Sequence, residues 1–230
     1  MTRRSNQSPG LPGLATDLAP APDLPDGVRH LPGFWSRARQ EATVAALRSA
    51  TDAAPPFRPT MPRTGKPFSV MMTNLGPLGW VSDRNGGYRY QPGHPDTGVP
   101  WPPIPEMVMD VWNAVAAYPH PPEACLVNVY DAQARMGLHQ DRDENDFDAP
   151  VVSISLGDTC RFRIGNTTRG GRTSSLMLQS GDVVVLGGPS RLRYHGVDRI
   201  LPGTSDLLAD WPGLHDGGRL NLTLRRVTKP

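Results

Sequence analysis

The sequence is poor in cysteine and has no long apolar segment. Only Cys125 and Cys160 are cysteines among 230 residues, and they do not form a Cys-x-x-Cys motif. A disulfide framework or a structural zinc knuckle is therefore not expected, and both residues are predicted to be small buried side chains in strands. No secretory signal pattern is visible, so the expected location is the reducing cytoplasm. No apolar run approaches the ~20 residues needed to cross a bilayer, so no membrane association is expected.

The sequence also lacks a strong excess of either charge. Lysine and arginine total 24 and aspartate and glutamate 22, which gives a formal net charge of +2. This balance permits a nucleic-acid partner without requiring one. The 24 glycines and 26 prolines, by contrast, are numerous and predict many turns and long irregular connections.

The chain is divided by composition into a tail and one domain. Residues 1–27 are rich in proline, serine, glycine and alanine without an apolar period, which predicts a disordered tail. Residues 28–230 are enough for a single well-buried domain. Within it, helical patterns cover residues 34–53, capped by Gly33 or Ser36, and residues 106–118, where apolar side chains recur at helical spacing.

The second half of the chain changes to a period of two. Strand-like runs separated by glycine-rich turns occupy residues 125–131, 151–157, 160–164, 175–179, 182–186, 191–195 and 219–227. Several short strands after two helices predict an α+β fold, a sandwich or jelly roll with the helices on one side. Upstream, Asn85-Gly86-Gly87 between aromatic residues predicts a β-hairpin flap within residues 68–92.

A short motif in the predicted core has the residue types of a metal site. Leu138-His139-Gln140-Asp141 supplies an imidazole and a carboxylate, and the distant His195 supplies a second imidazole. Two histidines and one carboxylate on one face of a metal are typical of non-haem Fe(II) oxygenases. A His-x-Asp pair alone also arises by chance, so the motif needs support from the rest of the chain. A zinc hydrolase is disfavoured, because no glutamate suited to act as acid or base lies beside His139.

The last predicted strand allows two interpretations. In residues 219–225, Leu220, Leu222 and Leu224 point to one side, and the polar side chains of Arg219, Asn221, Thr223 and Arg225 point to the other. The polar face could be an ordinary solvated face, or it could line a cavity in which two guanidinium groups hold a dicarboxylate. Asn128 and Tyr130, two residues apart on another predicted strand, would complete a 2-oxo-acid pocket in the second case.

Taken together, these motifs resemble the AlkB-type dioxygenases that repair alkylated nucleobases. The resemblance covers about residues 68–227 and is carried by CLVNVYDAQARMGLHQDRDENDFDAPVVSISLG, GDVVVLGGPSRLRYHG and RLNLTLRR, and by MMTNLGPLGW with the Gly-Tyr-x-Tyr that follows it. It implies a double-stranded β-helix (jelly roll) over residues 123–230, with the N-terminal helices packed on one sheet. It further implies that residues 68–92 form a nucleotide-recognition lid.

The resemblance also implies roles for individual residues. The implied Fe(II) ligands are His139, Asp141 and His195, and the implied 2-oxoglutarate contacts are Asn128, Tyr130, Arg219, Asn221 and Arg225. The implied contacts with a flipped nucleotide are Trp80, Tyr88 and Asp143, although Asp143 could equally be a solvated acid within the acidic run 141–148. Arg84, Arg89, Arg169 and Arg172 are candidate phosphate contacts.

The function implied by the resemblance is oxidative demethylation of bases such as 1-methyladenine and 3-methylcytosine. The co-substrates would be 2-oxoglutarate and O₂, and the products formaldehyde, succinate and CO₂. The expected partner is alkylated DNA, with RNA as an alternative, and the expected state is a monomer. An oxygenase acting on a protein or small molecule, and a non-catalytic jelly-roll binding module, are the competing hypotheses.

Overall fold

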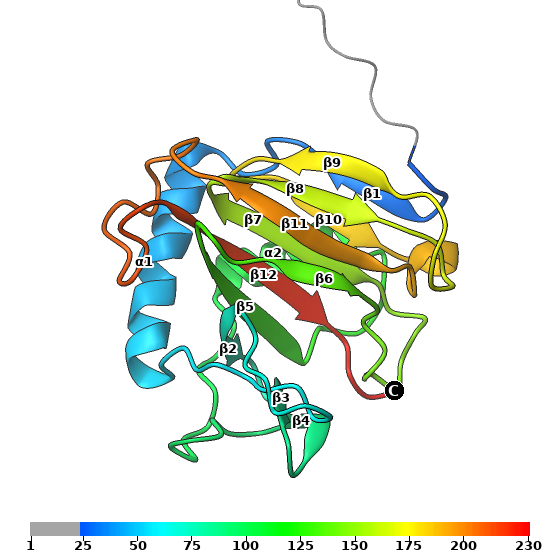
Figure 1. Ribbon diagram of the computed structural model, residues 1–230, viewed down its shortest axis with the longest axis horizontal. Helices are drawn as coiled ribbons and strands as arrows, with labels where there is room; N and C mark the ends of the chain where they lie inside the picture. Colours follow the sequence, from blue (N-terminus) through cyan, green and yellow to red (C-terminus); the bar gives the residue numbers. More distant parts are fainter. Residues whose placement is uncertain (1–23) are drawn as a thin grey trace, which may run out of the picture.

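The computed structural model describes residues 24–230, which form two antiparallel sheets, two helices and a separate hairpin (Figure 1). The larger sheet has the order β1-β10-β7-β12-β5-β2. Its strands are β1 (Val28–Leu31), β10 (Val183–Leu186), β7 (Val151–Gly157), β12 (Gly218–Arg225), β5 (Ala124–Asp131) and β2 (Met71–Leu75). The smaller sheet, in the order β6-β11-β8-β9, consists of β6 (Met136–His139), β11 (His195–Leu201), β8 (Thr159–Ile164) and β9 (Ser174–Leu178).

The two sheets face each other across an apolar core, as the jelly-roll prediction requires. That core joins Leu126 and Val184 of the larger sheet to Phe162, Leu176 and Val197 of the smaller one. Because side chains alternate along a strand, each strand of the larger sheet sends every second residue into this inter-sheet space. The functional residues described below lie at the end of the same space.

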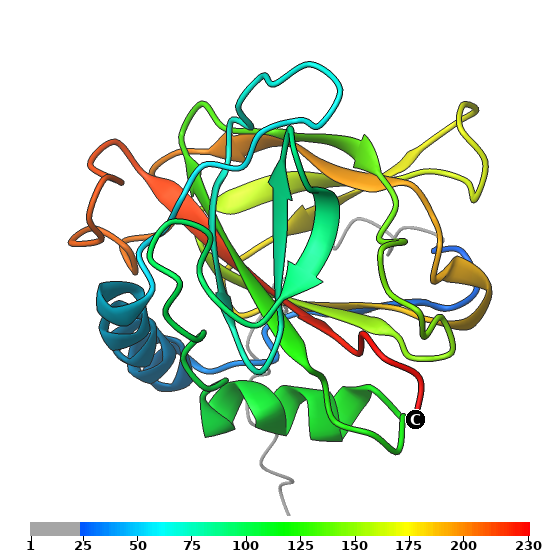
Figure 2. The same ribbon diagram turned by 90° about the horizontal axis from the view of Figure 1, so that it is seen from below.

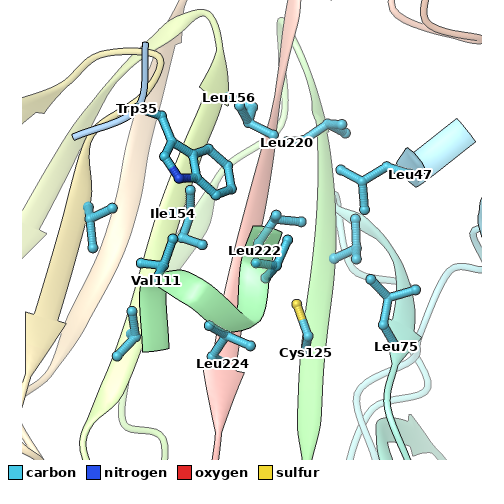
Figure 3. Close-up of a cluster of buried hydrophobic side chains, with 14 of the residues drawn as sticks. Trp35, Leu47, Leu75, Val111, Cys125, Ile154, Leu156, Leu220, Leu222 and Leu224 are labelled. Carbon is cyan, nitrogen blue, oxygen red and sulfur yellow. The ribbon is translucent and has the colours of Figure 1, made fainter. Parts of the chain in front are cut away.

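The opposite face of the larger sheet is covered by the two helices, which confirms the prediction of helices on one side (Figure 2). Helix α1 (Arg37–Ala53) begins at Ser36, whose hydroxyl accepts a hydrogen bond from the Arg39 amide, and α2 is Glu106–Val115. Leu47 of α1 and Val111 of α2 pack on the leucines of β12 (Figure 3). The buried Cys125 lies in this layer, so the leucine face of β12 points to the helices and its polar face points between the sheets.

Strands β3 (Gly79–Asp83) and β4 (Gly87–Gln91) form the predicted hairpin apart from both sheets. Its turn is closed by Asp83, whose Oδ1 accepts hydrogen bonds from the amides of Asn85 and Gly86. The hairpin is narrower than the predicted flap of residues 68–92, because Met71–Leu75 pairs with β5 as an edge strand of the larger sheet. Among the described residues, no helix combines the length and apolarity needed to cross a membrane.

The prediction of a strand over residues 191–195 is wrong. Gly188–Ser190 forms a 3₁₀ turn, and the amides of Arg191 and Arg193 donate back to the carbonyls of Gly188 and Ser190. The alternation of polar and apolar residues suggests a strand, but the Arg191 side chain is buried instead of facing solvent. The strand begins at His195 and runs to Leu201.

The predicted tail meets the described residues only at its end. Residues 1–23 of the tail predicted over 1–27 lie outside the described residues. Leu24 packs against the inter-sheet core, and the Gly27 carbonyl accepts a hydrogen bond from the Gly187 amide. Leu24 and Gly27 therefore contact the folded domain, although the composition predicts them as part of the tail.

Candidate active site between the sheets

The strands β6 and β11 bring the two distant histidines of the sequence motif together. Their antiparallel register places His195 opposite His139, and the two ring centroids are 4.6 Å apart. The register shifts immediately after His195, at Gly196. A Cβ atom at Gly196 would lie 2.5 Å from the Met136 carbonyl oxygen, so only glycine allows the strands to approach this closely.

The donor atoms of the triad converge on one point. His139 Nε2 lies 3.6 Å from Asp141 Oδ1, and His195 Nε2 lies 3.6 Å from Asp141 Oδ2. The Nδ1 atoms of the two histidines are each 2.9 Å from a backbone carbonyl, that of Gly137 or of Arg193. A carbonyl can only accept, so each Nδ1 carries the proton and each Nε2 offers its lone pair. The three ligand atoms lie within 4.8 Å of one another, which suits a single metal ion.

The protonation states also suit metal binding. Loss of surrounding water at the partly buried His139, together with the neighbouring His195, lowers its pKa to about 4. Burial would raise the pKa of Asp141, but the Arg225 guanidinium and the two imidazoles outweigh it and hold that pKa well below its ordinary value. His139 is therefore neutral and Asp141 ionised at neutral pH, as metal ligands must be.

A cavity of about 380 Å³ opens beside the triad and is lined by the polar face of β12. Arg219, Asn221, Thr223 and Arg225 all line it, together with Asn128 and Tyr130 of β5. Arg219 is only 1% exposed, and its Nη2 donates to the Ser155 hydroxyl at 2.7 Å. This placement decides between the two interpretations of the last strand, because the arginines do not face water.

Several polar atoms in this cavity are buried without a hydrogen-bond partner among the described residues. They are Asn128 Oδ1, Asp141 Oδ2, Arg219 Nε and Nη1, and Arg225 Nε. An unsatisfied buried polar group costs about 1–3 kcal/mol of stability, so several of them in one cavity indicate a ligand-binding site. The donors of Arg219 fit a carboxylate and Asp141 Oδ2 fits a cation, so the residues present suit both Fe(II) and 2-oxoglutarate.

The hairpin supplies an aromatic wall to the same cavity. Trp80 is 8% exposed, and its indole Nε1 donates to Asp143 Oδ2 at 2.8 Å. The ring of Tyr88, which is 51% exposed, stacks on Trp80 with centroids 5.6 Å apart and an interplanar angle of 20°. Trp80, Tyr88 and Asp143 all line the cavity together with His139, so the predicted base contacts and the predicted metal ligands share one space.

The four arginines predicted to contact phosphate do not all lie at the cavity. Arg169 lines the cavity, and its guanidinium carbon lies 5.7 Å from the centre of the Tyr194 ring. Arg172 is exposed and does not line this cavity. On the hairpin, Arg84 is exposed at the turn, and Arg89 pairs with Asp83 at 2.7 Å. Only Arg169 of these four is brought to the mouth of the site.

Comparison with known proteins places the chain in a family. Residues 27–225 match the model of the 2OG-Fe(II) oxygenase superfamily. The chain is 50% identical over 227 residues to an alpha-ketoglutarate-dependent dioxygenase AlkB homolog of Caulobacter vibrioides, covering 99% of this chain and 98% of that protein. The chain belongs to the AlkB-type 2OG-Fe(II) dioxygenases.

Two further similarities agree with this assignment. This dioxygenase is 41% identical over 189 residues to the alpha-ketoglutarate-dependent dioxygenase AlkB of Escherichia coli K12, covering 80% of this chain and 84% of that protein. A solved structure titled "The structure of OsALKBH1" superposes with a TM-score of 0.72 at 34% identity and covers 88% of this chain and 99% of that one. The predicted fold, enzyme class and co-substrates are thus confirmed, and a non-catalytic binding module is ruled out.

Several residues of this AlkB-type site were not predicted from the sequence. Arg225 Nη2 donates to Asp141 Oδ1 at 2.7 Å, and its Nη1 donates to Glu144 Oε1 and to the Tyr90 hydroxyl, each at 3.1 Å. The Tyr90 hydroxyl in turn donates to Glu144, and Arg191 Nη2 donates to Glu144 Oε2 at 3.1 Å. Neither Tyr90 nor Glu144 has a predicted role from the sequence, where Glu144 simply falls within the acidic run 141–148. A local pattern cannot reveal that the run turns inward at Asp141 and Glu144, because the two arginines that neutralise them come from distant segments.

Proposed function

We propose that this dioxygenase removes N-linked methyl groups from damaged bases such as 1-methyladenine and 3-methylcytosine in DNA, releasing formaldehyde, succinate and CO₂. The observation that carries the proposal is the shared cavity: the triad and the wall of Trp80, Tyr88 and Asp143 line one space. The AlkB-type relatives support the enzyme class, and the basic mouth residue Arg169 supports a polyanionic substrate. In this proposal the enzyme acts as a monomer in the cytoplasm.

The metal and 2-oxoglutarate would be held by separate groups of cavity residues. His139, Asp141 and His195 would hold Fe(II) through Nε2, a carboxylate oxygen and Nε2. Arg219, whose Nε and Nη1 have no partner among the described residues, would anchor a carboxylate of 2-oxoglutarate, with Asn128, Tyr130 and Asn221 beside it. Arg225, which pairs with Asp141 and lines the same cavity, would contact 2-oxoglutarate nearer the metal. When bound, Fe(II) would allow O₂ to react, with two electrons supplied by the conversion of 2-oxoglutarate to succinate and CO₂ and two by the methyl group. One oxygen atom would end in succinate and the other on the methyl carbon, which then leaves the nitrogen as formaldehyde.

Asp143 and Trp80 would select the damaged base. Methylation at N1 of adenine or N3 of cytosine gives the base a positive charge and blocks its pairing edge, so flipping it out of a duplex costs less than flipping a normal base. The indole of Trp80 offers a stacking surface for a cation. Asp143 Oδ2 is held by Trp80 Nε1, which fixes the carboxylate beside that surface.

The first experiment is an assay of the purified enzyme with Fe(II), 2-oxoglutarate and a panel of DNA and RNA oligonucleotides that carry one methylated base. We expect formaldehyde and succinate in equal amounts with methylated oligonucleotides, and no formaldehyde with the unmodified ones. His139→Ala should abolish both products and lower the affinity for Co(II) measured by absorption. If succinate forms but no oligonucleotide yields formaldehyde, the substrate is not one of these nucleic acids. That result would favour a protein or small-molecule substrate.

A second experiment tests base selection by charge. Asp143→Asn should weaken binding of cationic 3-methylcytosine by about tenfold, since one charge-assisted contact contributes about 1.5–3 kcal/mol. It should change the binding of neutral 3-methylthymine little, because the asparagine oxygen can still accept from Trp80. Asp148→Asn is the matched control, since Asp148 is an exposed acid of the same run. Equal losses for both bases would remove Asp143 from the proposed role.

A further inference from the structure

A second cavity of about 370 Å³ lies beside the active-site cavity. The two cavities share Leu138, Arg169 and Tyr194 as lining residues, so they adjoin at the position just before the metal ligands His139 and His195. We propose that this second cavity binds the nucleotide next to the methylated base, with its phosphate at Arg163 and Arg169 and its base against Tyr194. The inference rests on the proposed function and names a subsite of it.

The wall of the second cavity is held by backbone pairing that continues the smaller sheet. The Gly165 amide donates to the Tyr194 carbonyl at 2.7 Å, and the Tyr194 amide donates to the Asn166 carbonyl at 2.9 Å. Gln140, between two metal ligands, donates from Nε2 to the carbonyls of Thr167 and Leu192. The loop between β8 and β9 is therefore hydrogen-bonded to the segment that carries the metal ligands. These bonds fix the position of the second cavity relative to the first.

The charge of the second cavity favours an anion. Two guanidinium groups, of Arg163 and Arg169, line it, and none of its described lining residues is acidic. Arg169 forms no ion pair within residues 24–230. Arg163 donates to the Thr173 hydroxyl, and its Nη1 forms a long ion pair with Asp198 Oδ1 at 3.7 Å. Asp198 is already engaged by Arg161, so its charge is shared between two arginines.

The remaining lining residues point to a nucleotide rather than to a free anion. Tyr194 presents an aromatic ring, and stacking on such rings is a common way to bind single-stranded bases without sequence preference. Its ring already interacts with the Arg169 guanidinium, so an aromatic surface and a cation lie side by side. Gly165, Gly170 and Gly171 leave the wall open to close approach by a ligand. A strand that places one base beside His139 would carry its neighbour to this cavity, because the two spaces share their border.

The test measures binding by competition against a fluorescent single-stranded oligonucleotide, with the full-length enzyme at a fixed salt concentration. The competitors are a methylated mononucleotide and two dinucleotides that add one nucleotide on either the 5′ or the 3′ side. We expect one dinucleotide to bind at least about tenfold more tightly than the mononucleotide. Arg163→Met and Tyr194→Ala should each remove most of this gain.

The matched control is Arg161→Met. Arg161 lies two residues before Arg163 on β8, faces the same side and shares Asp198, but does not line the second cavity. The control should keep the full gain. If Arg161→Met and Arg163→Met lose the dinucleotide gain in affinity equally, the gain comes from general surface charge and the proposal is wrong. No gain from either dinucleotide would also overturn it, even where inorganic phosphate alone binds at Arg163.

The binding readout separates this inference from the proposed function. If the wild-type enzyme demethylates all three compounds but binds the mononucleotide and both dinucleotides equally tightly, the proposed function stands and the second subsite does not. Wild-type enzyme that releases no formaldehyde from any methylated nucleic acid contradicts the proposed function itself. Melting temperatures of all variants are measured in parallel, and Arg163→Met, a partly exposed position, is decisive if Tyr194→Ala does not fold.

Discussion

At the scale of single residues, the site is dominated by charges that the protein buries before any ligand arrives. Arg219 lies on the inner face of β12 with one hydrogen-bond acceptor, Ser155, and two donor atoms without a partner among the described residues. A buried guanidinium in this condition destabilises the fold, because it has lost water and gained little in return. The position therefore serves ligand binding at the expense of stability.

Replacing Arg219 by methionine should separate these two effects. Arg219→Met should raise the 2-oxoglutarate concentration needed for half-maximal turnover by about tenfold or more, because it removes a charge-assisted contact worth about 1.5–3 kcal/mol. Its melting temperature should not fall, since an apolar chain of similar length replaces an uncompensated charge. Succinate assays and thermal melts measure the two quantities. A large loss of stability together with unchanged 2-oxoglutarate dependence would refute this account of Arg219.

A second buried charge, Asp182, stabilises the fold, because its carboxylate oxygens accept hydrogen bonds from other parts of the chain. It accepts hydrogen bonds from His30 Nε2 at 2.9 Å, from the Gly33 amide at 2.8 Å and from the Gln179 amide at 2.9 Å. Burial raises the pKa of Asp182, but these bonds outweigh it, so its pKa lies below the ordinary value of 3.8. The ionised carboxylate therefore stabilises the folded chain, in full above the unfolded pKa and decreasingly as the pH falls through the folded one.

Asp182→Asn should accordingly destabilise the protein by about 1–3 kcal/mol at neutral pH. From about pH 5 downwards, the difference in the free energy of unfolding should narrow as Asp182 becomes protonated. Urea unfolding across this range measures it. Asp216→Asn is the control, because Asp216 is exposed near the start of β12. A difference that grows on acidification would contradict the assigned sign.

At the scale of elements, the sequence predicts strands well where one face is uniformly apolar, and less well where a segment is short or polar. The alternation in residues 125–131 and 219–227 corresponds to β5 and β12, because their leucine and valine faces pack on the helices. The four-residue strand β6 escaped prediction, since Gly137 interrupts its pattern. Residues 191–195 alternate like a strand, yet Arg191 turns inward to bond the carbonyls of Ala149 and Asp141, which no local pattern records.

The same limit applies to the site. The triad and the polar face of β12 could be predicted, because their chemistry is carried by residue type and spacing. Tyr90 could not, since its role depends on reaching Glu144 and Arg225 across the fold. Burial raises the pKa of Tyr90 well above its ordinary value, against the charge of Arg225, so the phenol keeps its proton and donates to Glu144. Through Arg225, which also holds Asp141, the hairpin is connected to a predicted metal ligand.

Tyr90→Phe should therefore loosen the hairpin. We expect faster hydrogen exchange of the amides of residues 79–91 and a weaker affinity for Co(II), with exchange in β5 and β12 unchanged. The hydroxyl contributes about 1 kcal/mol, so the effects should be several-fold rather than complete. Tyr88→Phe is the matched control on the same strand, because the Tyr88 hydroxyl makes no hydrogen bond to any described residue. The same exchange pattern in both variants would show that the Tyr90 hydroxyl does not connect the hairpin to the site.

At the scale of the whole molecule, the site joins the two sheets of the jelly roll. His139 and His195 come from the smaller sheet, and Asn128, Arg219 and Arg225 come from the larger one. The apolar core holds the sheets together over most of their area. At the site end the contact is made by polar groups, several of which have no hydrogen-bond partner among the described residues. A ligand that satisfies these groups binds only the folded chain and bridges both sheets.

Ligand binding should therefore stabilise the domain as a whole. Under anaerobic conditions, Fe(II) and 2-oxoglutarate at about 100 times their dissociation constants should each add about 2.7 kcal/mol. For a domain of this size each kcal/mol raises the melting temperature by about 2–4 °C, so the combined increase should be roughly 10–20 °C. Arg219→Met should retain the increase from Fe(II) and lose most of that from 2-oxoglutarate, whereas His139→Ala should lose the increase from Fe(II). If neither ligand shifts the melting temperature of the wild-type protein, the unpartnered groups between the sheets are not its binding site.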